Sequence, residues 1–486
     1  MPRIRTSALG LSALLALAAV PAAPSATTLP STDGVGSPNM EHVANVQWDG
    51  SLRRADNRPV DSQGGTDVEF ATIDGRDYAF SGTYRNGLQV IDVTDPEAPV
   101  QVATYDCQLL QGDVQVFQRD DRWLLTYTAD GGLGSRASKC YADAGVTGNL
   151  DGTLLIDVTD PTAPRSIGFA RVVGGSHNQT VHPSGKYLYN SNSGSAGRIE
   201  VIDITDPTQP KLLPLTTLPT RGDDSHDLTF NSAGTRAYSA ALDHTLVIDT
   251  TDPEKPKVLG SITDPAITLH HQADPVTIDG REYVIINDEL NGAGGNEVCP
   301  GGGLHVYDVT NPASPTKVGA WFSPEVTVRE GAPTGLGGTV TCTSHVFRIH
   351  EEQQILTIAW FGAGVRVIDL SGIADTTPVA GGIAGTQLTP GMREVGYYRF
   401  PADSDAWSAK AYRLDEDGSG YIFANDQTRG LDVFRYDASA AEAEDGGRWL
   451  TPAQALAETE ALRAAAGITG DVLRDLRPIC DLRGRI

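Results

Sequence analysis

The sequence is short of several features, and each shortage excludes a class of protein. Basic residues are scarce: 37 lysines and arginines stand against 62 aspartates and glutamates, for a formal net charge of −25. A surface this negative repels phosphate backbones and anionic lipids, which excludes nucleic-acid partners and electrostatic docking onto membranes. Only five cysteines occur in 486 residues, and no Cys-x-x-Cys spacing is present, so a zinc–cysteine site is not expected.

Catalytic motifs are missing as well. The chain has no P-loop, no dinucleotide glycine pattern, no His-Glu-x-x-His and no Gly-x-Ser-x-Gly elbow. Its one long apolar run, residues 8–20, follows a basic start and is too short to span a bilayer. We therefore expect residues 1–26 to be a cleaved signal peptide, and the mature chain to be extracellular or periplasmic, without membrane insertion.

What the chain has in excess is turn residues and a repeat. Glycine (53) and proline (29) suit many tight turns. The phrase Leu-x-Val-Ile-Asp-x-Thr-Asp-Pro predicts a strand and a turn, and each full or weaker copy centres on one aspartate. These are Asp92, Asp157, Asp203, Asp249, Asp308 and Asp369, with a degenerate seventh copy that ends at Asp437. The shortest spacing, about 45 residues, is typical of a four-stranded propeller blade.

Seven such sets predict an all-β fold, a seven-bladed β-propeller over residues 43–437. The seventh set lacks a fourth strand, whereas residues 43–48 resemble the fourth strands, so we expect this N-terminal segment to close the ring and remove its exposed edges. Residues 438–486 are predicted to form a linker and a short helical tail, with helices over 451–465 and 470–483. The tail is interpreted as an appendage packed on the rim, with a partner-binding module as the alternative.

The repeats resemble those of the LVIVD-repeat family of secreted bacterial β-propellers, over roughly residues 43–437. The resemblance implies the fold but no particular function, since that family is described mostly by its repeat. A more distant, fold-level similarity is to the selenium-binding protein and methanethiol oxidase group. It is carried by histidines on the inner strands of a seven-bladed frame.

A column of polar residues marks the start of the innermost strands, which surround the central channel. Convergent imidazoles suit copper or zinc, so His177, His226, His271 and His345 are predicted metal ligands. A carboxylate at this level either ligates or orients a ring. The alternative is a structural polar channel that holds ordered water. The predicted ligand-binding residues are Asp67, Asp113, His270 and Lys410, with the register of His270 and His271 uncertain by one.

The fold also predicts the cysteine pairing. Cys107 and Cys299 would pair with Cys140 and Cys342, because the loops that carry them emerge on the face where the histidine column begins. The bridges Cys107–Cys140 and Cys299–Cys342 would either preorganise a pocket mouth or simply staple long loops. Cys480 in the tail has no assigned partner.

One further pattern resembles a calcium loop. It falls on a hairpin turn without flanking helices, so a plain turn is favoured over a calcium site. Its residues are Asp415, Asp417, Ser419 and Asp426.

Two classes of function follow from these observations. The first is a monomeric, non-catalytic propeller that binds a small ligand or a protein partner on its loop-rich face. The second is a copper- or zinc-dependent enzyme, such as an oxidase, that uses the channel histidines. A structural protein of the cell surface is a third class, which the sequence neither supports nor opposes.

Overall fold

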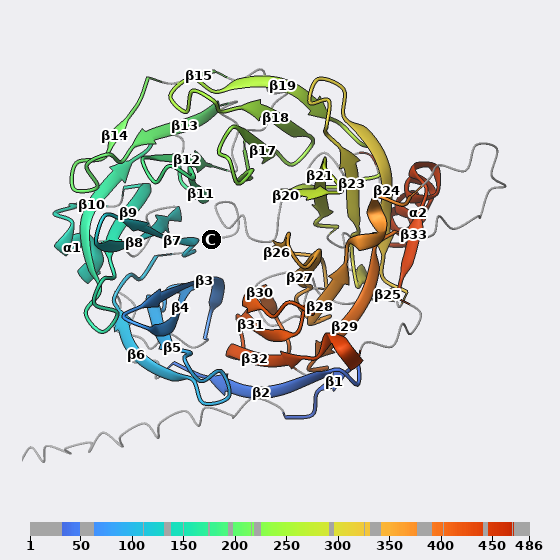
Figure 1. Cartoon of the computed structure of the whole chain (residues 1–486), viewed down its shortest axis with the longest axis horizontal. Coiled ribbons are helices and arrows are strands. Elements are labelled where there is room, and N and C mark those ends of the chain that lie inside the picture. Colours follow the sequence, from blue (N-terminus) through green and yellow to red (C-terminus); the bar gives the residue numbers. More distant parts are fainter. Residues whose placement is uncertain are drawn as a thin grey trace, which may run out of the picture. The chain divides into compact units, whose positions relative to one another are not determined.

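Seven antiparallel sheets stand around one axis, each running from an inner strand at the centre to an outer strand at the rim (Figure 1). The computed structural model of the protein describes residues 32–48, 63–109, 111–130, 138–148, 150–173, 175–192, 198–214, 216–217, 225–290, 296–324, 326–330, 342–376, 391–401, 403–440, 446–468 and 470. The predicted signal peptide, most of the predicted second helix and Cys480 lie outside these ranges.

The first four blades each use four strands that are consecutive in the chain, listed from the inside outwards. Blade 1 is β3 (Gly65–Ile73), β4 (Arg76–Thr83), β5 (Leu88–Asp92) and β6 (Val100–Tyr105). Blade 2 is β7 (Val114–Arg119), β8 (Arg122–Ala129), β9 (Gly152–Asp157) and β10 (Arg165–Arg171). Blade 3 is β11 (Asn178–Val181), β12 (Tyr187–Ser191), β13 (Arg198–Asp203) and β14 (Lys211–Leu212), with β15 (Thr216–Thr217) also on β13. Blade 4 is β16 (Asp227–Phe230), β17 (Arg236–Ala240), β18 (Thr245–Asp249) and β19 (Lys257–Ile262).

The remaining three blades carry additions from elsewhere in the chain. Blade 5 is β20 (His270–Ile278), β21 (Arg281–Asp288), β23 (Leu304–Asp308) and β24 (Thr316–Phe322), with β33 (Arg448–Leu450) outermost. Blade 6 is β26 (Phe347–His350), β27 (Ile355–Ala359), β28 (Val365–Asp369) and β29 (Arg393–Arg399), with β1 (Val35–Gly36) outermost. Blade 7 is β30 (Ala406–Leu414), β31 (Gly420–Asp426), β32 (Gly430–Tyr436) and β2 (Met40–Val46). A separate ribbon pairs β22 (Asn296–Cys299) with β25 (Thr327–Glu330).

The N-terminal strand closes the ring, as the sequence predicts. β2 pairs with β32 antiparallel, from Met40 opposite Tyr436 to Val46 opposite Leu431, so the first and last parts of the propeller share blade 7 (Figure 1). The strand begins three residues earlier than the predicted segment. Because the outer edge of β32 is covered in this way, blade 7 has four strands, like blades 1, 2 and 4.

The repeated phrase forms the third strand of its blade and the turn that follows. β5 is buried along its whole length, and its last residue begins an Asx turn in which Asp92 Oδ1 accepts from Thr94 N at 3.0 Å. The same bond recurs from Thr159 N to Asp157 at 3.0 Å. The aspartate of each phrase therefore fixes the turn at the outer end of the strand, and its apolar residues fill the space between blades.

The C-terminal part packs against blade 5. Helix α2 (Pro452–Ala465) begins with a capping box between Thr451 and Gln454, which confirms the predicted helix. Its buried residues Ala455 and Leu462 join the apolar cluster that contains Phe322. Among the described residues, no helix is long and apolar enough to cross a membrane.

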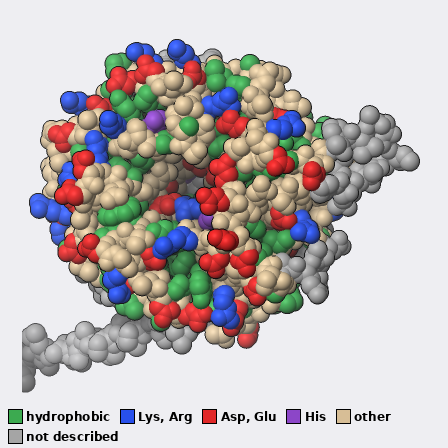
Figure 2. All heavy atoms as spheres, in the orientation of Figure 1, with side chains coloured by type: hydrophobic (Ala, Val, Ile, Leu, Met, Phe, Trp, Pro, Cys, Tyr) green, Lys and Arg blue, Asp and Glu red, His purple; other side chains and the backbone are tan. Residues whose placement is uncertain are grey.

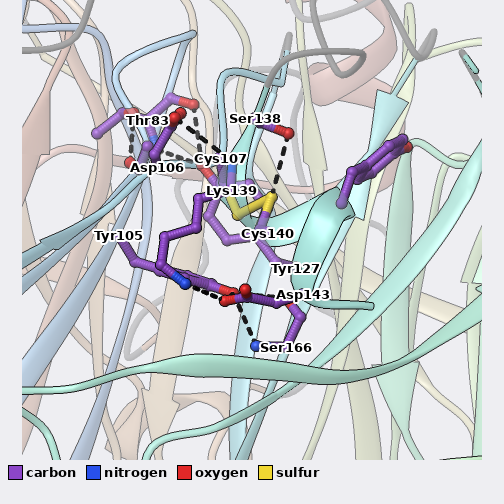
Figure 3. The surroundings of a disulfide bond; sticks show 12 residues. Thr83, Tyr105, Asp106, Cys107, Tyr127, Ser138, Lys139, Cys140, Asp143 and Ser166 are labelled. Atoms are coloured by element: carbon purple, nitrogen blue, oxygen red, sulfur yellow. Dashed lines mark hydrogen bonds and ion pairs between the residues drawn. A yellow bond between two sulfur atoms is a disulfide. The ribbon is translucent and has the colours of Figure 1, made fainter. Parts of the chain in front are cut away.

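Both predicted disulfides are present. Cys107 and Cys140 are joined within blade 2, where Cys140 lies in the short helix α1 (Lys139–Asp143) (Figure 3). Cys299 and Cys342 are joined across blades 5 and 6, since Cys299 ends β22 and Cys342 precedes β26. The first bridge therefore pins a loop onto its own blade, and the second ties two neighbouring blades together.

Candidate functional site

The inner strands enclose a cavity of about 500 Å³ at the centre of the ring. Figure 2 shows a hollow there, with acidic and basic side chains around it. Inner-strand residues from all seven blades line the cavity, so it lies on the propeller axis. Of the predicted site residues, it is lined by Asp67, Asp113, His177, His226, His271, His345 and Lys410.

Four imidazoles follow one another around one side of the cavity, from blade 3 to blade 6. We call His177, His226, His271 and His345 the histidine arc. The ring centroids are 4.7 Å apart for His177 and His226, 4.5 Å for His226 and His271, and 4.4 Å for His271 and His345. All four rings are buried. The structure therefore brings together the four predicted metal ligands.

Three of these rings are oriented by a hydrogen bond from Nδ1 to an acceptor on another residue. His177 Nδ1 donates to Asp130 Oδ2 at 3.0 Å, His226 Nδ1 to the carbonyl of His271 at 2.9 Å, and His345 Nδ1 to the carbonyl of Trp407 at 2.7 Å. An Nδ1–H that donates to a carboxylate or carbonyl leaves the Nε2 lone pair for another partner. This is the arrangement that orients histidines as metal ligands.

Burial keeps His271 and His345 uncharged. It lowers the pKa of His345 to about 3, although the hydrogen bond to Trp407 opposes the shift. Burial and the neighbouring histidines lower the pKa of His271 well below its usual range. Neutral imidazole is the form that binds metal ions.

A carboxylate lies beside the last two rings. Ligand atoms of His271, Glu289 and His345 all lie within 4.8 Å of one another, and His271 Nε2 is 4.0 Å from Glu289 Oε2. All three residues are buried. Two imidazoles and one carboxylate are a donor set used for zinc and for ferrous iron.

Backbone and side-chain contacts between blades 5 and 6 hold this cluster in register. Asn287 Nδ2 donates to the carbonyl of His345 at 3.0 Å, and Ser344 Oγ donates to the carbonyl of Asp288 at 2.7 Å. The Cys299–Cys342 bridge joins the same two chain segments. The residues next to Glu289 and His345 are therefore fastened to each other.

Asp130 and Glu289 were missed by the sequence reasoning, which considered only the inner strands. Each of them directly follows the second strand of its blade: Asp130 follows β8 and Glu289 follows β21. In an antiparallel hairpin, the end of the second strand lies beside the start of the first. An acidic residue directly after the second strand of a blade could therefore have indicated both positions from the sequence.

The cavity is also lined by charged residues, which we call the acidic arc. Blades 7, 1 and 2 supply some of them, and others lie on the inner strands of blades 4 to 6, farther along than the histidines; together they are Asp67, Glu69, Asp113, Asp227, Asp274, Arg348 and Lys410. Lys410 Nζ lies 2.6 Å from Asp67 Oδ1 and 2.9 Å from Glu69 Oε1, and Arg348 Nη2 is 2.5 Å from Glu69. Burial alone would raise the pKa of Glu69, but Arg348 and Lys410 together lower it to about 2. Glu69 is therefore ionised in a buried ion-pair network.

Other carboxyls of the acidic arc have no such pairing with a cation. Burial raises the pKa of Asp227 to about 8, with Asp274 adding to the shift. Burial, with the charge of Asp67, raises the pKa of Asp113 well above its usual range. The Asp227 carboxyl therefore retains its proton near neutral pH and can donate a hydrogen bond into the cavity.

Aromatic residues close the arc beyond His345. Phe361 and Trp407 lie with ring centroids 4.6 and 4.5 Å from the imidazole. Phe361 has a φ of 41°, a left-handed conformation that a bulky residue adopts only under constraint. Backbone bonds in both directions with Ala406 hold it there, at 3.1 and 3.3 Å. The ring thus shields one side of His345 from water.

Two features of the sequence are not matched by a site in the structure: His270 as a cavity residue and the calcium-like pattern. His270 is outside the cavity lining, and its Nδ1 bonds Thr245 Oγ1 at 2.8 Å, so the structure places His271 in the channel and His270 away from it. Successive residues of a strand face opposite sides, which makes this choice of register decisive. In the calcium-like pattern, Asp417 bonds Ser419 N at 2.9 Å in the hairpin turn, whereas Asp426 lies at the far end of β31.

The fold and the channel define the protein as a seven-bladed β-propeller with a histidine-lined central cavity. The LVIVD repeat model matches residues 75–107, which contain β4, β5 and β6 of blade 1. The resemblance stated from the repeat is thereby confirmed for this part of the chain. No curated protein matches the chain significantly.

Solved structures of low sequence identity share the fold. The periplasmic gluconolactonase PpgL of Pseudomonas aeruginosa is 13% identical, with a TM-score of 0.51, over 77% of this chain and 95% of that one. Hydrazine synthase of Kuenenia stuttgartiensis is 12% identical, with a TM-score of 0.49, over 82% of this chain and 100% of that one. The similarity to the selenium-binding protein group stays a prediction.

Proposed function

We propose that this protein is a secreted propeller that binds a transition-metal ion in its central channel through the histidine arc. The observation that carries the proposal is the cluster of His271, Glu289 and His345, whose ligand atoms lie within 4.8 Å of one another in a buried place. The leader-like residues 1–26 and the two disulfides support secretion.

The donor chemistry fits a transition metal. The pKa values of His271 and His345 are lowered, so both rings are neutral, and the Nδ1–H of His345 is held by a carbonyl. Ligand atoms on one zinc ion are about 3 Å apart, so these three ligand atoms, which lie within 4.8 Å of one another, would have to close by about 1 to 2 Å. Rotation of one carboxylate covers such a distance. Copper, zinc and ferrous iron all accept this set of ligands.

A bound ion would act beside the cavity. His271 and His345 both line it, so a small ligand in the cavity would reach the ion directly. The ion would supply Lewis-acid or redox chemistry, while the protonated carboxyl of Asp227 offers a hydrogen-bond donor in the same cavity. This supports a small polar ligand over a protein partner, whether the protein only binds that ligand or transforms it.

Metal analysis of the purified protein tests the proposal. A chelator first removes any bound metal. Separate samples are then loaded with copper, zinc or ferrous iron, the iron sample under anaerobic conditions, and each sample is desalted. We expect at least one bound equivalent of one metal. The double variant His271→Gln, His345→Gln should lose that equivalent, whereas His270→Gln, which changes the neighbouring residue outside the cavity, should keep it. No bound metal in the folded wild type, or full retention in the double variant, contradicts the proposal.

A further inference from the structure

The first two rings of the histidine arc face each other through the same kind of atom. His177 Nε2 lies 3.1 Å from His226 Nε2, and both side chains are buried. This contact belongs to blades 3 and 4, next to the cluster of blades 5 and 6, and the rings of His226 and His271 are 4.5 Å apart. Two facing nitrogens require an account of the proton between them.

The Nδ1 atom of each ring faces a hydrogen-bond acceptor. His177 Nδ1 faces the carboxylate of Asp130, and His226 Nδ1 faces the carbonyl of His271, and both partners accept hydrogen bonds. When both rings carry a single proton, these acceptors place it on Nδ1. The two Nε2 lone pairs then point at one another at 3.1 Å, which is repulsive unless a positive charge lies between them.

We infer that His177 and His226 bind a second metal ion, so that the channel holds a centre of two ions. The inference rests on the proposed function, since it places this ion beside the first. Two nitrogens at about 2.05 Å from one ion are about 2.9 Å apart at a right angle and about 3.3 Å apart at a tetrahedral angle. The observed 3.1 Å falls between these values.

The surroundings suit a cation that keeps open coordination positions. Asp130 is fully buried and places a carboxylate on the far side of His177, where it increases the basicity of the ring. His177 and His226 both line the cavity, so water or a small ligand can occupy the remaining positions of the ion. Two neighbouring metal ions can bind one substrate group from two sides.

The competing explanation is a shared proton. If His177 is an imidazolium stabilised by Asp130, its Nε2–H donates to His226 Nε2 and no ion is needed. The two explanations differ in metal stoichiometry. They also differ in the response to Asp130→Asn, which removes the charge beside His177 and leaves the size of the side chain nearly unchanged.

The test is metal stoichiometry by elemental analysis and native mass spectrometry, using zinc or copper alone as the probe. We expect two equivalents in the wild type and one in each of two double variants, His177→Gln with His226→Gln and Glu289→Gln with His345→Gln. Asp130→Asn should weaken the binding of one equivalent by roughly 10- to 100-fold. Circular dichroism and melting of each variant identify any that fails to fold.

The results that contradict the second ion differ from those that contradict the proposed function. One equivalent in the wild type that survives in the His177, His226 variant overturns the second ion and leaves the proposed function standing; the pair then shares a proton. Loss of all metal in that variant, with its fold intact, also overturns it, because the four histidines then serve a single ion. No metal in the folded wild type overturns both proposals.

Discussion

The two sides of the channel use the same strand positions for opposite chemistry. In blades 3 to 6 the start of the inner strand supplies His177, His226, His271 and His345. In blades 7, 1 and 2 the corresponding places hold Lys410, Asp67 and Asp113. The four histidines are buried, and backbone and carboxylate acceptors orient three of their rings, whereas Lys410 and Asp67 on the other side are stabilised by an ion pair. A propeller can therefore change the function of its axis one blade at a time.

The largest effect is expected on stability in the acidic arc. Lys410→Met removes the cation beside Asp67 and Glu69 and leaves buried carboxylates with less compensation. Breaking a buried pair from one side costs about 3–5 kcal/mol, which urea unfolding would measure. Adding Asp67→Asn should recover part of that loss. If Lys410→Met were as stable as the wild type, the ion-pair account of this arc would be wrong.

The second-largest effect is expected when either disulfide is removed. Removal of either bridge as a double serine variant should cost about 2–4 kcal/mol, since the closed loops are of similar length. Only Cys299→Ser with Cys342→Ser should also weaken metal binding, by about tenfold or more, because this bridge joins the segments that carry Glu289 and His345. Equal metal affinities in the two variants would show that the second bridge serves folding alone.

The pH dependence of stability should distinguish two carboxyls of the acidic arc. Burial raises the pKa of Asp227 to about 8, so its contribution is complete below about pH 4 and is lost as the pH rises towards 8. The ion pairs lower the pKa of Glu69 to about 2, so its contribution is present above about pH 4.5 and is lost as the pH falls towards 2.

Urea unfolding over a series of pH values measures both effects. Asp227→Asn should flatten the decline between pH 4 and 8, by at most about 1.4 kcal/mol per pH unit. Glu69→Gln should leave that decline in place and flatten the loss at acid pH. An unchanged decline in Asp227→Asn would show that this carboxyl does not retain its proton.

The smallest effect is expected outside the channel. Asp417→Ala removes one turn contact on the surface, and calcium should shift the melting temperature of neither this variant nor the wild type, since Asp417 and Asp426 lie at opposite ends of β31. A stability change within about 0.5 kcal/mol is expected. A melting temperature that rises with calcium in the wild type and not in the variant would restore the calcium-loop interpretation.

The fold could be predicted from the sequence because one blade strand repeats its pattern. Leu-x-Val-Ile-Asp fixes the third strand, and the spacing between copies fixes the blade, so the ring, its closure and both disulfides followed from the order of strands. The fifth strands β1 and β33 carry no repeat and contain two and three residues. Segments that short have no periodicity that a sequence pattern can show.

The site could be predicted only where one residue per blade defined it. The histidine arc was visible as a column, while Glu289 and Asp130 belong to a second position in the blade, after the second strand. The choice between His270 and His271 depended on an irregular register in β20, where the pairing shifts between His270 and Ala273. A bulge moves side chains from one face to the other, and the sequence does not mark it.

The most direct test of the channel metal is anomalous diffraction from crystals of the loaded protein, collected at the absorption edge of the metal. The account predicts a strong peak beside the central cavity, within bonding distance of His271 and His345. A peak only at surface residues, or no peak in the channel of a protein that binds metal in solution, would contradict it.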